Sequence, residues 1–543
     1  MLRRLERENR LILTFALGFF LIFLAIPLIL IVFQSLRTDS GIGPGNYIGV
    51  LTQNSFFRAF GNSLWVSLCS GALSMALAFL LAYTVNCTNL SVRLKKLITV
   101  ATGLPMLLPT ITYGFAIIYT YDRQGLIFRL FGGYHPQIYG FNGMVFGYVV
   151  YTLPISFMLI DNGFRYIDKQ FILVCRLMGD RPLRAFFTAI LSPLAGTLGT
   201  ALIQSFSLSF TDFGIPASVG GQYNVVATVL YDQMLGSVPD FGKGSAVAIF
   251  MLIPSAASIF LLNRLGRYSF RYSRISEIEF KKAPIKDFIC AVCSVFILLA
   301  VLSIFLVIFI VPFVTMWPYR LTFTFSHIAA VFEAPDLCGV YLNSLFVSAM
   351  TALFGTLLAY AAALVTARSR IPEKWLKSVD GIALVTNTVP GMVLGISFLL
   401  AFSGTPLHNT FLLIILCNII HYFSSPYFMI KETLAKLNSS WEPTAKLMGD
   451  SWLKTVRRVL IPNTVPTILD VFGYYFINAM VTISAVVFLT GAFTMVITTK
   501  IQYLQHVGDF DEIFALSVLI FLTNLTVKLA VKTSSDFIRK KRG

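Results

Sequence analysis

Few side chains in this sequence have the types and spacing that chemistry needs. Cys290 and Cys293, in CAVC, have the spacing of a redox pair, but they lie inside an apolar block without a second pair. The five histidines form no cluster with the spacing of metal ligands. The sequence has neither a G-x-x-x-x-G-K-[ST] phosphate loop nor a set of nucleophile, base and orienting residue. We therefore expect a protein that is not an enzyme and that holds no metal or cofactor of its own.

A polar phrase centred on glycine occurs twice, 270 residues apart, as RLMGD and KLMGD. Gly supplies the positive φ that ends a helix, and the Asp after it can cap the next helix. Pro193 and Pro462 then close the element. One copy alone favours a helical loop that only packs under its bundle, but two equivalent copies favour a helix–turn–helix that docks into another protein. The docking residues are Arg176, Leu177, Met178, Gly179, Asp180, Lys446, Leu447, Met448, Gly449 and Asp450.

Long apolar blocks surround these phrases and must position them. Of the 543 residues, 56% are hydrophobic and only 12% are charged, whereas soluble domains carry roughly 25% charged residues. A membrane-spanning helix needs about 20 apolar residues, and in lipid the backbone must satisfy its own hydrogen bonds. The sequence therefore predicts an all-α integral membrane protein of twelve transmembrane helices. Their approximate spans are 11–33, 62–85, 98–121, 144–160, 194–213, 244–263, 288–312, 343–367, 381–402, 410–430, 467–490 and 513–531.

The placement of positive charge predicts the orientation of these helices. Lys and Arg favour the cytoplasmic ends of membrane helices. If the N-terminus lies inside, the inside segments hold 35 of the 42 Lys and Arg residues and the outside loops hold 7. We expect both termini in the cytoplasm and the first block retained, since it is too long for a signal peptide. The net charge of +17 is then an orientation signal, and nucleic acid is not an expected partner.

The chain also repeats itself along most of its length. NSLWVSLCSGALSMALAFLLAYTV, from Asn62, pairs with NSLFVSAMTALFGTLLAYAAALVTA, from Asn343, and NVVATVLY pairs with TMVITTKI 270 residues later. We expect two tandem six-helix modules, 1–280 and 281–543, related by an axis along the membrane normal. The docking loops, at 161–193 and 431–466, both fall between the fourth and fifth helices of their module.

These loops resemble the EAA loop of binding-protein-dependent ABC importer permeases, which have the type I, MetI-like transmembrane fold. In that loop Glu-Ala-Ala is followed by three residues, Gly, nine residues and Ile-x-Leu-Pro. Gly449 and the segment 459–462 stand at the family spacing. The segments 443–445 and 173–175 replace Glu-Ala-Ala, and Glu442 lies one place early. The missing acidic position puts a glutamate's role there in doubt but not the docking role.

Two further stretches, 138–168 and 205–221, resemble the fused permeases of ferric-iron, thiamine and 2-aminoethylphosphonate importers, and the choice among these substrates stays open. The resemblance implies a bacterial inner-membrane protein with two ABC ATPase subunits, which bind ATP and Mg²⁺, and an extracytoplasmic substrate-binding protein. The alternative is a secondary transporter with two parallel six-helix halves. That class would place a shared basic signature between helices two and three of each half, where none occurs.

One acidic residue, Asp212, is expected at the outer end of a membrane helix. Ionisable groups at membrane depth usually mark pathways or gates, and a gating Asp212 should find its partner near Thr482 and Ser484 of the second module. The alternative is that Asp212 caps a helix or anchors it at the interface, while the hydroxyls bond to their own helix backbones. The tentative substrate path comprises Ser207, Ser209, Thr211, Asp212, Thr482 and Ser484.

Overall fold

In the residues that it describes, the computed structural model consists mostly of helices, with two short β-hairpins. It describes residues 2–39, 41–123, 125–130, 136–167, 174–175, 177–265, 283–369 and 371–542. Within these residues, nine helices are long and apolar enough to cross a membrane, or up to twelve if each of three bent pairs is one span. The predicted helical membrane fold is therefore confirmed as a class, and the count of twelve stays a prediction.

The chain divides into two compact units, and neither is a continuous half of the sequence. Unit 1 comprises Met1–Gly49, Gln233–Leu252 and Ile328–Gly543, and unit 2 comprises Val50–Asp232 and Ile253–His327. The helix that opens each half of the chain thus belongs to the unit built mainly from the other half. The module boundary predicted at residue 280 concerns the sequence repeat and stays a prediction.

Unit 2 is arranged around α4 (Asn54–Cys87), which packs on α8 (Phe141–Phe164) and α11 (Ser192–Thr211). A Cβ at Gly71 would lie 3.2 Å from the carbonyl oxygen of Leu202 on α11, so a small residue here permits a close helix approach. The other elements are α5 (Val92–Thr102), η2 (Pro105–Leu107), α6 (Thr110–Tyr121), α7 (Leu126–Leu130), α10 (Pro182–Phe186), η3 (Phe187–Leu191), α12 (Gly214–Val219), most of α13 (Val226–Leu235), part of α14 (Phe241–Leu265), α15 (Pro284–Ile310), η5 (Val311–Phe313), and β3 (Val314–Met316) paired with β4 (Arg320–Phe323).

Unit 1 is arranged around α17 (Pro335–Arg368), which packs on α24 (Ile461–Val481) and α21 (Ser424–Lys436). A Cβ at Gly355 would lie 2.8 Å from the ring of Tyr475, so glycine again permits close packing. The other elements are α1 (Leu2–Phe20), η1 (Leu21–Ala25), α2 (Ile26–Leu36), β1 (Arg37–Thr38) paired with β2 (Gly41–Ile42), most of α3 (Gly45–Leu51), most of α16 (Ser326–Glu333), α18 (Glu373–Thr388), α19 (Gly391–Phe402), α20 (Phe411–His421), α22 (Trp441–Leu447), α23 (Trp452–Thr455), η6 (Val456–Leu460), η7 (Val486–Phe488), α25 (Ile497–Val507) and α26 (Phe510–Arg542).

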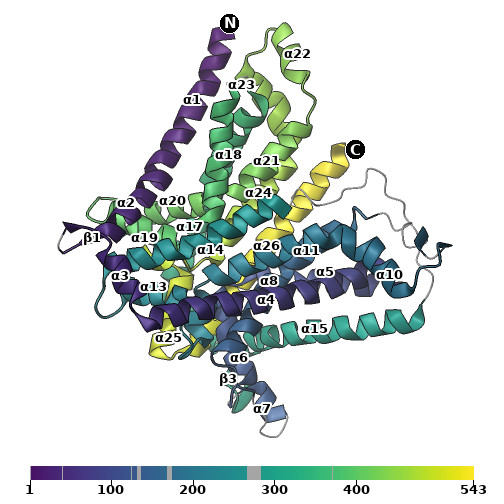
Figure 1. Cartoon of the computed structure of the whole chain (residues 1–543), viewed down its shortest axis with the longest axis vertical. Coiled ribbons are helices and arrows are strands. Elements are labelled where there is room, and N and C mark those ends of the chain that lie inside the picture. Colours follow the sequence, from purple (N-terminus) through teal and green to yellow (C-terminus); the bar gives the residue numbers. More distant parts are fainter. Residues whose placement is uncertain are drawn as a thin grey trace. The chain divides into compact units, whose positions relative to one another are not determined.

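The opening helices of the two halves make matching contacts in their units. In unit 2, α15 packs along α4, α5 and α6 (Figure 1), and its Phe305 ring lies 6.5 Å from that of Tyr113. In unit 1, α1 packs on α17 and α2 packs on α19, and the Phe20 ring lies 4.5 Å from that of Phe423. Each unit is therefore completed by a helix encoded at the start of the other half.

Three of the predicted helices are bent. The predicted spans 98–121, 381–402 and 410–430 correspond to α5 with α6, α18 with α19, and α20 with α21, which bend by 110°, 104° and 55°. Pro109 and Pro390 stand at the first two bends, as the residues before α6 and α19. Proline has no N–H and disfavours helical geometry in the residue before it, so the helix stops and restarts in a new direction.

Candidate functional site

The second docking phrase folds into a glycine-terminated helix end. Gly449 has φ +83°, the left-handed conformation that only glycine adopts at no cost. The N–H of Met448 donates to the carbonyl of Thr444 at 3.1 Å, and the N–H of Asp450 donates to that of Ala445 at 2.9 Å. This pattern satisfies the last carbonyls of α22 and reverses the chain.

The first docking phrase has the same geometry. Gly179 has φ +82°, the N–H of Met178 donates to the Val174 carbonyl at 2.9 Å, and the N–H of Asp180 donates to the Cys175 carbonyl at 3.0 Å. The predicted glycine turn is thus confirmed in both copies. Arg176 lies outside the described residues, and Lys446 lies within α22.

The aspartates after the glycines do not cap the next helix, so that expectation is wrong. Ser451 is the residue that caps α23, because its side chain accepts the N–H of Lys454 at 3.3 Å. Asp450 instead forms an ion pair with Lys454, and Asp180 forms one with Arg184 at 3.4 Å. Each pair joins the aspartate before a short helix to a basic residue four positions later on that helix, α10 or α23, where opposite charges attract weakly.

The prolines also act differently from the prediction. Pro193 and Pro462 do not end the docking element, since each stands in the first turn of α11 or α24. One turn of π-helix, η3 or η6, precedes each proline and joins the short helix to the long one. The continuous spans Leu183–Thr211 and Trp452–Val481 result. The wider turn accommodates the missing N–H of proline without a break.

The turns expose large apolar side chains. Leu447 and Met448 are 89% and 80% exposed, and Leu177 and Met178 are both 79% exposed. Cys175, just before the first pair, is buried against Ala185 and Ala189, so the turn packs on its own helices and points these pairs outward. An exposed apolar group on an ordered turn is a surface that a partner protein can cover.

The second loop is tied to a long helix by residues that the sequence did not reveal as a pair. The Arg368 guanidinium, at the end of α17, binds both carboxylate oxygens of Glu442 on α22, at 2.5 and 2.6 Å. The side chain of Arg368 is only 6% exposed. The only sequence signals were an Arg at the end of an apolar block and a Glu one place before the family's acidic position.

Asp212 lies in the turn between α11 and α12 and is buried, with 8% exposure. Its Oδ1 accepts the hydroxyl of Thr110 at 2.7 Å, and its Oδ2 accepts the N–H of Ile215 at 2.9 Å. Both partners belong to unit 2, so the expected partners near Thr482 and Ser484 are wrong. The contacts are those of a buried cap, and a role in the substrate path stays a prediction.

The first-half hydroxyls divide into two kinds. Thr211 donates to the carbonyl of Ser207, within its own helix, at 2.9 Å. Ser209 instead accepts the hydroxyl of Ser70, on α4, at 3.3 Å and is 1% exposed. The Thr211 hydroxyl thus bonds to its own helix backbone, as the alternative interpretation predicts, whereas the Ser209 hydroxyl links α11 to α4.

The second-half hydroxyls lie in the matching turn after α24. The carbonyl of Thr482, directly after that helix, accepts the hydroxyl of Thr498 at 2.8 Å. A Cβ at Gly391 would lie 2.6 Å from the Ser484 Oγ and 3.2 Å from the ring of His421, so Ser484 faces the start of α19 and the end of α20. Asp212 and Thr482 therefore occupy equivalent places, each immediately after a long helix.

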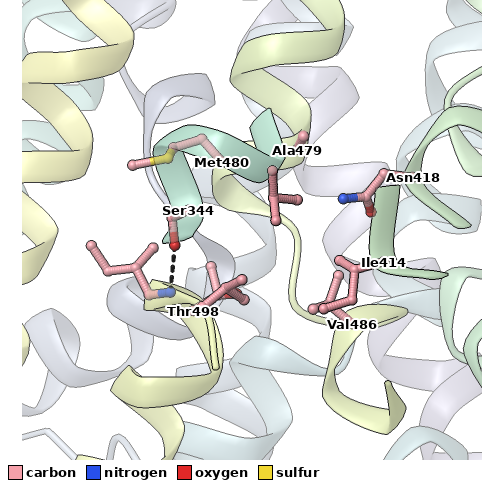
Figure 2. Close-up of a pocket in the computed structure, with 10 residues that line it drawn as sticks. Ser344, Ile414, Asn418, Ala479, Met480, Val486 and Thr498 are labelled. Atoms are coloured by element: carbon pink, nitrogen blue, oxygen red, sulfur yellow. Dashed lines mark hydrogen bonds between the residues drawn. The ribbon is translucent and has the colours of Figure 1, made fainter. Parts of the chain in front are cut away.

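Near this turn, unit 1 holds a small cavity of about 10 Å³, which is lined mostly by apolar side chains and by three polar residues, Asn418, Ser344 and Thr498 (Figure 2). Asn418 is fully buried and points into it, and among the described residues neither of its amide atoms has a hydrogen-bond partner. The volume suits one water molecule. It is too small for a transported solute.

Comparisons with known proteins agree with this architecture. Residues 355–540 match the family described as the binding-protein-dependent transport system inner membrane component. These residues include α21 to α24 and hence the second docking loop. The second half of the chain is thus similar to the membrane components of binding-protein-dependent transport systems, in agreement with its long apolar helices.

Full-length relatives extend the likeness to both halves. The ferric transport system permease protein FbpB of Actinobacillus pleuropneumoniae is 24% identical over 93% of this chain and 75% of its own length. The putative ferric transport system permease protein FbpB 1 of Haemophilus influenzae is 26% identical over 87% of this chain and 77% of its own. The molybdenum transport system permease protein ModB of Azotobacter vinelandii is 28% identical over 32% of this chain and 80% of its own. The predicted resemblance to a fused ABC importer permease is confirmed.

Proposed function

We propose that this chain is the transmembrane permease subunit of an ATP-driven importer, which receives its substrate from an extracytoplasmic binding protein. The duplicated turn carries the proposal: two glycine caps of the same geometry each present an exposed Leu-Met pair. One ATPase subunit would cover each pair, so closure of the ATPase dimer would move both loops. ATP and Mg²⁺ would be bound by those subunits, since this sequence has no phosphate loop.

The proposed topology has twelve crossings with both termini in the cytoplasm of a bacterial cell, and the protein lies in the inner membrane. The bias of Lys and Arg toward one set of loops supports this orientation. The nine to twelve candidate spans support the count. Both docking loops then face the compartment that holds ATP.

The proposed substrate is ferric iron, with 2-aminoethylphosphonate and thiamine as the other candidates. The names of the full-length relatives support iron. The binding protein would select the substrate, so uptake in cells that express the whole system tests this point. Loss of radioactive ferric iron uptake on deletion of this chain, with phosphonate and thiamine uptake unchanged, is the expected result.

The assembly is tested by the mass of the complex purified through a tag on this chain. One copy already carries both docking loops, so we expect one copy with two ATPase subunits. A complex of two copies with two ATPase subunits, or a chain that never associates with an ATPase, would contradict the proposed function.

A further inference from the structure

A single guanidinium joins three parts of unit 1. Besides its two bonds to Glu442, Arg368 donates from Nη1 to the Leu437 carbonyl at 3.0 Å and from Nη2 to the Asn438 carbonyl at 2.8 Å. Leu437 and Asn438 connect α21 to α22. The end of α17 therefore holds both the start of the docking helix and the connection that leads into it.

A second group of contacts fixes the same end of the bundle. The hydroxyl of Tyr427, on α21, bonds to Thr366 of α17 at 3.0 Å and to Asp380 of α18 at 2.6 Å. Lys431, also on α21, forms an ion pair with Asp380. Three helices, α17, α18 and α21, are thus joined near the end of α17, and Arg368 extends this group to the docking loop.

We infer that Arg368 and Glu442 are a positioning pair that makes the second docking loop and α17 move as one body. The inference rests on the proposed function, since it describes how motion imposed on the loop reaches the membrane helices. A fork of two parallel charge-assisted bonds is short and strongly directional. Because the Arg368 side chain is nearly buried, water competes little for these bonds.

The pair belongs to the second half alone. Helices α4 and α17 are both 34 residues long, and Cys87 ends the first where Arg368 ends the second. In the first docking phrase, the position that corresponds to Glu442 is Ile172. Cys and Ile cannot form an ion pair, so the first loop must follow its helices through other contacts.

The pair can be tested with Glu442→Gln, which keeps the side chain's size but removes its charge. Glu373→Gln is the matched control, because Glu373 pairs with Lys377 on α18 and both side chains are more than two-thirds exposed. Amide hydrogen exchange of the segment 437–455 is measured first, in the permease without partners. We expect exchange to rise roughly five-fold or more in Glu442→Gln and to stay unchanged in the control.

The second measurement uses the complex with its ATPase, trapped with Mg-ATP and vanadate. In the parent, trapping should change the exchange of both 437–455 and the last turns of α17. In Glu442→Gln the segment 437–455 should still respond to trapping, but the change in α17 should be lost, whereas the change in α4 persists. The exchanged pair Arg368→Glu with Glu442→Arg should restore the α17 response at least in part.

Two results would overturn the inference: parent-like exchange and trapping responses in Glu442→Gln, or an exchanged pair as loose as the single variant. If no ATPase associates with the parent chain, the proposed function fails instead. The exchange of the permease alone then still decides whether the pair holds the loop to α17. Gel filtration of each variant shows that the change is local and not a loss of fold.

Discussion

The two docking loops share one turn and differ in how they are held. Their glycine caps agree to within a degree in φ and use the same pair of backbone bonds. The second loop alone has the residues for the buried fork to α17, through Arg368 and Glu442. The turn depends on residues next to it in sequence, whereas the fork joins residues 74 apart. Repeated halves thus keep the surface that meets the partner and diverge in the contacts behind it.

The turns after α11 and α24 show a similar divergence. In unit 2, Asp212 accepts a bond from Thr110, and a Cβ at Gly214 would lie 2.3 Å from the Thr110 hydroxyl. In unit 1 the two residue types are exchanged. The glycine, Gly391, begins α19, and the hydroxyl, that of Ser484, lies in the turn after α24. Each half places one glycine opposite one hydroxyl, but only the first half adds a carboxylate.

The largest expected effect comes from removing the fork. Arg368→Met keeps the apolar stem but leaves the Glu442 carboxylate without its partner, which should cost about 3–5 kcal/mol, the typical loss when a buried ion pair is broken. Glu442 is 20% exposed, so water should reduce the loss toward the lower end. Denaturant unfolding monitored on 437–455 measures the effect. A loss no larger than that of Lys377→Met, at an exposed pair, would contradict the account.

The next effect is expected at Asp212. Asp212→Asn replaces one acceptor oxygen by a donor, so either the Thr110 bond or the Ile215 bond is lost, at a cost of about 1–3 kcal/mol. Because the turn joins two helices, basal ATP hydrolysis and transport should both change, while the binding protein's affinity for substrate does not. Thr482→Val is the matched change in unit 1 and should have less effect, since it removes a neutral hydroxyl that hydrogen-bonds to Tyr422 and removes no charge. If Asp212→Asn hydrolyses ATP and transports substrate like the parent, Asp212 serves only as a helix cap.

A smaller effect is expected at the turn glycines. A Cβ at Gly449 would meet no atom within 4 Å, so Gly449→Val should cost only the backbone strain of about 1–2 kcal/mol. Gly449→Asn is the control, because Asn tolerates the left-handed conformation. We expect ATPase association to weaken in the Val variant and to survive in the Asn variant. Equal association in both would show that the cap geometry does not matter for docking.

The smallest effect is expected at Gly391 and Ser484, the glycine and the hydroxyl whose positions are exchanged between the two halves. Gly391→Ala brings a Cβ within 2.6 Å of the Ser484 Oγ, which must move. The added change Ser484→Gly removes that atom, so the double variant should recover part of a loss of about 1 kcal/mol. Thermal unfolding of the three variants measures the recovery. A double variant less stable than Gly391→Ala would contradict the packing described for this turn.

The sequence predicted what depends on neighbouring residues. Apolar blocks marked the helices, and the glycine phrases marked two turns with positive φ. The bends had a readable signal in Pro109 and Pro390, both inside predicted spans, but block length alone hid it. No sequence signal indicated that the opening helix of each half belongs to the unit built mainly from the other half. Hydrophobicity does not specify which neighbour a helix packs on. The partners of Arg368 and Asp212 were missed for the same reason, since tertiary contacts over long separations determine them.

The central claim is that both glycine turns contact an ATPase, and crosslinking in living cells tests it most directly. A photoreactive amino acid is placed at Met178 in one strain and at Met448 in another, both exposed positions on the turns. Val92, which is 80% exposed on α5 outside the docking loops, serves as the control. The account predicts that Met178 and Met448 each crosslink to the same nucleotide-binding protein and that Val92 does not. If neither turn captures a nucleotide-binding protein, or if Val92 captures it equally well, the docking account is wrong.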